Sequence, residues 1–368
     1  MTIRPRPEIE SLRVSPHGGF HADEWRALGN VIDFSSNVNP FGVSPRVRAA
    51  LQTAIIERHP DPAATELRDA LATRLQLPRD QIIVGNGSLE LIRAVAIAYV
   101  RASDVALIVG PTFGEYRVAV QVMGARVEDF RARAENDFQL DVDALAARIA
   151  ELKPCLAFIC NPNNPTGVFS AHEQIAQLVD ASPETLWVVD EAFIAFAPRP
   201  EGFASRKPFG SGNVVIMRSM TKDYAIPGLR LGYALADRDV IAALAKVRAP
   251  WSVNALAQAA GLAVLSDDAF LRDTLAKIRA ASRELHDAIT RLGWRVIPSA
   301  VHFFLVEVGD ARAFRAMLAQ RGCIVRDCAS FGLPEFVRVA TRTPVENARL
   351  IAALEDLRYD SAFSRSTR

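Results

Sequence analysis

The most informative segment of the sequence is Ser219-Met-Thr-Lys-Asp-Tyr-Ala-Ile-Pro-Gly-Leu-Arg230, together with the apolar run Val214–Met217 that precedes it. The apolar run predicts a buried strand, so the polar residues begin where that strand ends. Two hydroxyls beside a lysine and an arginine form a plausible cradle for an anion. Taken alone, this is a weak signal, and its meaning depends on the strand ends before it.

Two earlier stretches show the same arrangement. Asn161-Pro-Asn-Asn-Pro-Thr-Gly167 follows an apolar run, and its composition predicts a turn. A turn at the carboxyl end of a parallel strand is also where α/β sheets place ligands. Trp187-Val-Val-Asp190 ends on a carboxylate, which in isolation is equally explained by a helix cap or a solvated loop.

Short apolar runs alternate with helical stretches through the middle of the chain, which predicts an α/β fold. Five or six runs that are apolar on both faces indicate a mainly parallel sheet covered by helices on both sides. After Trp251 the pattern changes to that of a smaller α+β domain, with which the extended segment before Pro45 is expected to pack. We therefore expect a large domain over residues 45–255, a small domain from 1–44 and 256–360, and a flexible tail at 361–368.

Composition excludes several classes of protein. The 368 residues carry a formal net charge of +1 with dispersed basic residues, so neither nucleic acid nor an acidic membrane is an expected partner. The N-terminus lacks an apolar signal core and no apolar run is long enough to span a bilayer, which predicts a soluble, cytoplasmic protein. The pairs Cys155/Cys160 and Cys323/Cys328 are spaced too widely for a usual zinc site, so free thiols and no metal are expected.

The order and spacing of Asn164, Asp190, Lys222 and Arg230, all at strand ends, resemble the class I/II aminotransferase superfamily. The resemblance implies pyridoxal 5'-phosphate (PLP) as cofactor and the PLP-dependent transferase fold type I. In that fold the large domain holds a mainly parallel seven-stranded sheet sandwiched by helices, beside a small α+β domain.

The cofactor's chemistry explains why each residue type is needed. Lys222 would hold the aldehyde as a Schiff base, and Asp190 would keep the pyridine nitrogen protonated so that the ring accepts electrons. Asn164 can donate to the phenolic ring oxygen. Phe113 lies where the superfamily stacks an aromatic ring on the cofactor, although a phenylalanine there is otherwise simply core. The expected phosphate ligands are a helix N-terminus, hydroxyls and an arginine, supplied by Asn86, Gly87, Ser88, Ser219, Thr221 and Arg230.

Within the superfamily the chain resembles threonine-phosphate decarboxylases and the related histidinol-phosphate aminotransferases. His17-Gly-Gly19, Tyr224–Arg230 and Phe193, where many aminotransferases place a tyrosine, favour the decarboxylase branch. The first expectation is therefore a decarboxylase acting on L-threonine O-3-phosphate through an external aldimine, in cobalamin biosynthesis. The alternative is an aminotransferase using histidinol phosphate or another amino donor with a 2-oxo acid. A PLP-binding regulator without turnover is a remote third, because no helix-turn-helix pattern precedes the large domain.

The resemblance also implies the substrate contacts. Arg338 would bind the substrate α-carboxylate through two parallel hydrogen bonds, with Asn164 beside it, although a lone arginine on a strand can also be a surface charge. A phosphate on the substrate would meet Arg326, Ser35 and His17, of which His17 is nearly as well explained as a structural residue. The resemblance also predicts a homodimer, in which His59 stands where relatives carry a tyrosine that reaches the neighbouring subunit's PLP phosphate.

Overall fold

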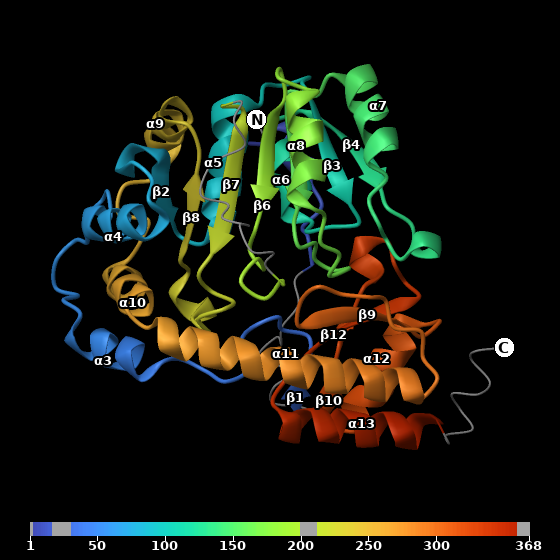
Figure 1. Ribbon diagram of the computed structural model, residues 1–368. Helices are drawn as coiled ribbons and strands as arrows, with labels where there is room; N and C mark the ends of the chain where they lie inside the picture. Colours follow the sequence, from blue (N-terminus) through green and yellow to red (C-terminus); the bar gives the residue numbers. More distant parts are fainter. Residues whose placement is uncertain (1–2, 17–30, 199–211, 359–368) are drawn as a thin grey trace.

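A seven-stranded sheet forms the centre of the protein in the computed structural model, which describes residues 3–16, 31–198 and 212–358 (Figure 1). Six of its strands run in the same direction, whereas β8 is antiparallel to both of its neighbours, β2 and β7. The carboxyl ends of the parallel strands therefore meet at one edge of the sheet. In spatial order the strands are β2 (Ile82–Gly85), β8 (Gly232–Leu235), β7 (Val214–Ser219), β6 (Leu186–Asp190), β5 (Leu156–Cys160), β3 (Val105–Gly110) and β4 (Arg126–Arg131).

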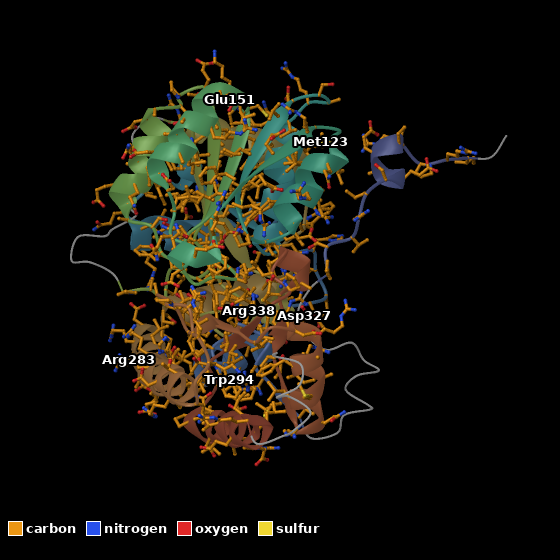
Figure 2. The ribbon with its side chains drawn as sticks, turned by 90° about the vertical axis from the view of Figure 1, so that its right-hand side faces the viewer. Met123, Glu151, Arg283, Trp294, Asp327 and Arg338 are labelled. Atoms are coloured by element: carbon orange, nitrogen blue, oxygen red, sulfur yellow. The ribbon has the colours of Figure 1, made fainter. Side chains whose placement is uncertain are left out.

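A second, three-stranded antiparallel sheet lies below that edge, in the order β11 (Arg326–Asp327), β12 (Phe336–Ala340) and β9 (Phe303–Glu307). Three helices accompany it: α11 (Asp268–Arg291), α12 (Ala311–Gln320) and α13 (Pro344–Arg358). Figure 2 shows Arg338 at the junction between the two layers, with Glu151 in the upper and Trp294 in the lower one. The edge of the large sheet thus faces the small sheet.

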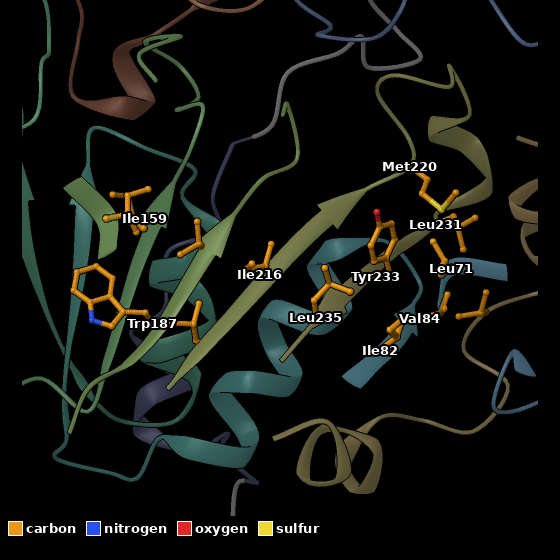
Figure 3. Close-up of a cluster of buried hydrophobic side chains, with 14 of the residues drawn as sticks. Leu71, Ile82, Val84, Ile159, Trp187, Ile216, Met220, Leu231, Tyr233 and Leu235 are labelled. Atoms are coloured by element: carbon orange, nitrogen blue, oxygen red, sulfur yellow. The ribbon is translucent and has the colours of Figure 1, made fainter. Parts of the chain in front are cut away.

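Helices cover both faces of the large sheet because successive strand residues alternate between two apolar cores. Leu107 and Val109 belong to the core under α4 (Thr65–Leu75), α7 (Val142–Leu152), α8 (His172–Asp180) and α10 (Ala255–Leu265), part of which Figure 3 shows. Ala106 and Ile108 belong to the core under α5 (Ser88–Tyr99), α6 (Glu115–Val122) and α9 (Arg238–Val247). The predicted α/β class and seven-stranded sheet are confirmed.

The N-terminal segment reaches the small sheet's side of the molecule. Strand β1 (Ile32–Asp33) pairs in parallel with β10 (Cys323–Ile324), and Phe34 is buried in the same core as α12 and α13. This pairing supports the proposal that the segment before Pro45 belongs to the small domain. The exact domain boundaries remain a prediction, and the tail 361–368 lies outside the described residues.

The edge strand β4 is not among the apolar runs of the sequence because its residues, Arg-Val-Glu-Asp-Phe-Arg, are largely polar, as suits an edge strand with half-exposed faces. The segment Arg295–Pro298 makes a single bridge, between Val296 and Val306. In the described part of the chain, α1 (Pro7–Glu10) and α3 (Pro45–Thr53) precede α4. Among the described residues, no helix has the length and apolar character needed to cross a membrane.

Candidate active site

The predicted site residues gather around a cavity of about 450 Å³ at the carboxyl edge of the large sheet. This volume suits a cofactor with a small substrate. Strand pairing brings the ends together, since Cys160 lies beside Asp190 and Asp190 beside Met217. The sequence-predicted residues that line the cavity are Ser35, Gly87, Ser88, Phe113, Asn164, Asp190, Ser219, Thr221, Lys222, Arg230, Arg326 and Arg338.

Asp190 is a buried carboxylate at the end of β6, with 3% of its surface exposed. Its Oδ2 accepts a hydrogen bond from the Tyr116 hydroxyl at 2.7 Å, and its Oδ1 accepts one from the Ala192 amide at 3.0 Å. Burial raises the pKa of Asp190, and these hydrogen bonds oppose that shift. Among the described residues no cationic side chain lies within ion-pair distance of it. A protonated ring nitrogen would supply the missing positive charge.

Lys222 follows β7 and faces the same cavity. Its pKa is lowered to about 8, first by burial and then by the positive charges of Arg230 and Arg338. At neutral pH a lysine with that pKa has a much larger uncharged fraction than an exposed lysine. The uncharged amine is the form that acts as a nucleophile. The backbone carbonyl of Lys222 accepts a hydrogen bond from the Asn39 amide at 2.9 Å, which fixes the loop against the N-terminal segment.

The phosphate cradle is formed by two hydroxyls, a guanidinium and a helix N-terminus. The Ser219 and Thr221 hydroxyls lie 2.7 Å apart, and α5 begins at Ser88 with no side chain capping it. Gly87 has a φ of +75°, and a Cβ on it would lie 2.9 Å from Nη2 of Arg230, so the arginine rests directly on this glycine. Anions bind readily where free backbone amides and a helix dipole point at them.

Arg338 is a buried guanidinium whose hydrogen bonds all go to neutral groups. It donates to Oδ1 of Asn164 and, at 2.7 Å, to the Ser35 carbonyl, while its Nε has no partner. Burial lowers the pKa of Arg338 to about 10. No carboxylate among the described residues lies within ion-pair distance. A buried positive charge without a counter-charge is costly, so the geometry suits an incoming anion.

Arg326 stands directly opposite Arg338, because their strands pair at these two positions. Side chains at paired positions share a face, and both arginines line the cavity. Arg326 donates to the Pro16 carbonyl at 2.9 Å and to the Ser330 hydroxyl at 2.8 Å. Burial lowers the pKa of Arg326. An anion bound in the cavity would interact favourably with both guanidiniums.

Other predicted residues occupy different places. Asn86 is exposed and does not line the cavity, and its amide donates to Glu90 at 2.7 Å. The Ser35 hydroxyl donates to Asp33 at 2.6 Å, so its hydrogen is directed away from a substrate. His59 also lies outside the cavity and stacks on Trp251 with ring centroids 4.8 Å apart. His17 falls outside the described residues.

Tyr116 is a cavity residue that sequence reasoning left without a role. It follows Phe113 by three positions, across the turn that begins α6, and its backbone amide donates to the Phe113 carbonyl at 3.4 Å. That spacing was the available signal. Phe193, expected to replace a tyrosine, is buried, lines the cavity and packs edge-on against Phe303 at 4.8 Å.

A larger cavity of about 960 Å³ shares only Ala192 and Ser219 with the first. Its wall includes the ion pair between Arg218 and the buried Glu191, at 2.8 Å. Lys222 and Asp190 do not line it, so the smaller cavity is the candidate active site. Three features of the smaller cavity fit PLP: a buried lysine, a buried carboxylate without a positively charged partner among the described residues, and a cradle for an anion. This fold and this site define a PLP-dependent enzyme.

The chain belongs to the aminotransferase class I and II family, whose model matches residues 29–354. It is 40% identical over 341 residues to a histidinol-phosphate aminotransferase of Symbiobacterium thermophilum, covering 90% of this chain and 92% of the relative. Among solved structures it resembles the histidinol-phosphate aminotransferase of Sinorhizobium meliloti in complex with PLP, with 26% identity, TM-score 0.87 and coverage of 100% and 99%. It also resembles the L-threonine-O-3-phosphate decarboxylase of Porphyromonas gingivalis, with 30% identity, TM-score 0.75 and coverage of 89% and 99%.

Proposed function

We propose that this enzyme is an aminotransferase for a phosphorylated amine, with histidinol phosphate as donor and a 2-oxo acid as acceptor. The observation that carries the proposal is the pair Arg326 and Arg338, which face one cavity from opposed strand positions. Two guanidiniums beside the nucleophilic lysine suit a substrate that brings a dianionic phosphate or a carboxylate. The 40% identity to a histidinol-phosphate aminotransferase supports transamination over the decarboxylation expected first.

The residues present would divide the work as follows. Bound PLP supplies an aldehyde for the substrate amine and a ring that accepts electrons from the bond being broken. Lys222 would hold the cofactor, and as a free amine its Nζ would carry a proton to and from the substrate. Asp190 would keep the cofactor nitrogen protonated, and Arg338 would orient the substrate's anionic group. Phe113 and Phe193 cover the cavity with apolar surface and keep water from the reacting atoms.

Decarboxylation of threonine phosphate is the second candidate, because two observations favour it. Phe193 offers no hydroxyl to the cofactor, and the threonine-phosphate decarboxylase structure is 30% identical to this chain. The choice between the reactions depends on which bond at the substrate carbon stands perpendicular to the cofactor ring. Both candidates share the phosphate site, so that site alone does not separate them.

Reactions run without an amino acceptor distinguish the two candidate activities. The purified PLP form is mixed with histidinol phosphate or with O-phosphothreonine, without a 2-oxo acid. Transamination converts the cofactor to its pyridoxamine form and stops after one equivalent of product. Decarboxylation of O-phosphothreonine releases CO₂ and phosphorylated aminopropanol over many turnovers and leaves the cofactor unchanged. Sustained CO₂ release with no response to histidinol phosphate would reverse the order of the two candidates.

We expect Arg326→Ala to weaken a phosphorylated substrate and spare its unphosphorylated analogue. A charge-assisted hydrogen bond contributes roughly 1.5–3 kcal/mol, so kcat/KM for histidinol phosphate should fall about ten- to a hundredfold. The kcat/KM for histidinol should hardly change. Arg312→Ala, at an exposed position on α12, is the matched control. Equal losses with both substrates would mean that Arg326 serves only to hold the Pro16 segment.

We further propose a homodimer in which His59 reaches the partner's cofactor phosphate. His59 and Trp251 form an aromatic pair outside this chain's cavity, and Ile55, Ile56 and Trp251 expose 52%, 68% and 48% of their surface. A cluster of large exposed apolar side chains marks a surface that another chain covers. The site would then be completed by a residue from the second copy.

Mixed dimers test this arrangement. A Lys222→Ala chain paired with a His59→Ala chain holds one site with both residues intact, if His59 acts across the interface. We expect isolated mixed dimers to have about half the activity of the unaltered dimer, because one of their two sites is intact. Each parent dimer should be impaired at both sites. Mixed dimers no more active than the His59→Ala parent would show that His59 acts within its own chain or only in packing.

A further inference from the structure

Tyr116 makes contacts that link two parts of the cofactor site. The tyrosine is fully buried, and its ring stacks on Phe158 with centroids 4.8 Å apart and planes inclined by 9°. Its ring also meets that of Phe113 edge to face, at 5.6 Å and 84°. Its hydroxyl donates to Oδ2 of Asp190 at 2.7 Å. One side chain therefore touches both the ring expected over the cofactor and the carboxylate expected at its nitrogen.

We propose that Tyr116 is a positioning residue of the cofactor site, which orients Phe113 with its ring and aims the Asp190 carboxylate with its hydroxyl. The inference rests on the assignment of Asp190 to the cofactor nitrogen. Stacking on Phe158 fixes the tyrosine ring, so the hydroxyl can hold the carboxylate in one rotamer before the cofactor binds. Such preorganisation lowers the cost of binding.

The hydroxyl also affects the charge of Asp190. The other titratable groups around this carboxylate are the Cys160 thiol on β5, Lys222 on the loop after β7, and Glu191, which follows it in the chain. Burial raises the pKa of Asp190 most and Glu191 adds to this, whereas the hydrogen bonds from Tyr116 and Ala192 and the charge of Lys222 lower it. Removing the hydroxyl should therefore raise the pKa, so that the carboxylate becomes protonated at a higher pH.

The test is PLP binding to the apoprotein, measured by equilibrium titration across a pH series. Tyr116→Phe keeps the stacked ring and removes only the hydroxyl. We expect PLP to bind about ten- to a hundredfold more weakly at neutral pH, the effect of losing one hydrogen bond to a charged group. The pH at which affinity is lost on acidification should move up by about one to two units relative to the unaltered protein. Tyr99→Phe, a half-buried tyrosine on α5 away from the cavity, is the control and should match the unaltered protein.

Two results would overturn the proposal: unchanged affinity in Tyr116→Phe, or a loss of equal size at every pH, which a purely structural role would give. Replacing Tyr116 by 3-fluorotyrosine is a second test if the phenylalanine variant does not fold. It preserves the shape and makes the hydroxyl a stronger donor, so the same pH midpoint should move down. Asp190→Asn distinguishes a failure of the Asp190 assignment from a failure of the Tyr116 inference. If it binds PLP normally, the Asp190 assignment fails; if it weakens PLP while Tyr116→Phe does not, only the Tyr116 inference fails.

Discussion

Lys222→Ala should abolish turnover while the fold persists. Among the lysines that the structure describes, Lys222 alone lines the cavity, so the variant loses the amine proposed to hold the cofactor covalently and to move the proton. Removing a catalytic nucleophile can cost about a millionfold in kcat. The fold should persist because Lys222 makes no side-chain hydrogen bond or ion pair with any described residue, and its burial disfavours its charge. The measurements are kcat and the far-ultraviolet circular dichroism of the variant.

Borohydride treatment gives the complementary result. Reduction of the yellow PLP form should fix the label on the peptide that contains Lys222, found by mass spectrometry. Lys246→Ala, an exposed lysine on α9, is the control and should retain full activity and labelling. A label on another lysine, or a protein that stays colourless with added PLP, would contradict the central assignment.

Arg338→Met should be the second most damaging change. It removes the guanidinium from a buried site, and the loss of such a partner for a substrate carboxylate is worth about 2–5 kcal/mol, or roughly thirty- to several-thousandfold in kcat/KM. The effect on folding should be small because opposing contributions nearly cancel. Relief of an uncompensated buried charge stabilises the variant, while Asn164 and the Ser35 carbonyl lose a donor.

The measurements for Arg338→Met are kcat/KM for the 2-oxo acid half-reaction and the free energy of unfolding. Arg117→Met, at a half-exposed position on α6 paired with Asp129, controls for the loss of a charge. An unchanged kcat/KM would remove Arg338 from substrate binding. A collapse of the fold would instead indicate that its contacts with Asn164 and Ser35 are mainly structural.

The sequence predicted those parts of the site that lie at strand ends. Asp190 and Lys222 follow apolar runs, and in a parallel sheet all such ends meet at one edge, so their proximity follows from periodicity and strand direction. The pairing of Arg326 with Arg338 depends on the register between β11 and β12, which no local pattern encodes. The hydrogen bond from Tyr116 to Asp190 depends on how α6 packs against the sheet. Strand β4 was missed because an edge strand needs few apolar residues.

The antiparallel strand β8 has a mechanical consequence. Because it turns back beside β7, one connection carries both Lys222 near its start and Arg230 near its end. The residues proposed to hold the cofactor covalently and to bind its phosphate therefore belong to a single segment. Arg338, proposed to bind the substrate, lies on the small sheet instead. If these roles hold, a change in the spacing of the two sheets would leave the cofactor contacts of Lys222 and Arg230 in place and would alter only the angle at which the substrate meets the cofactor.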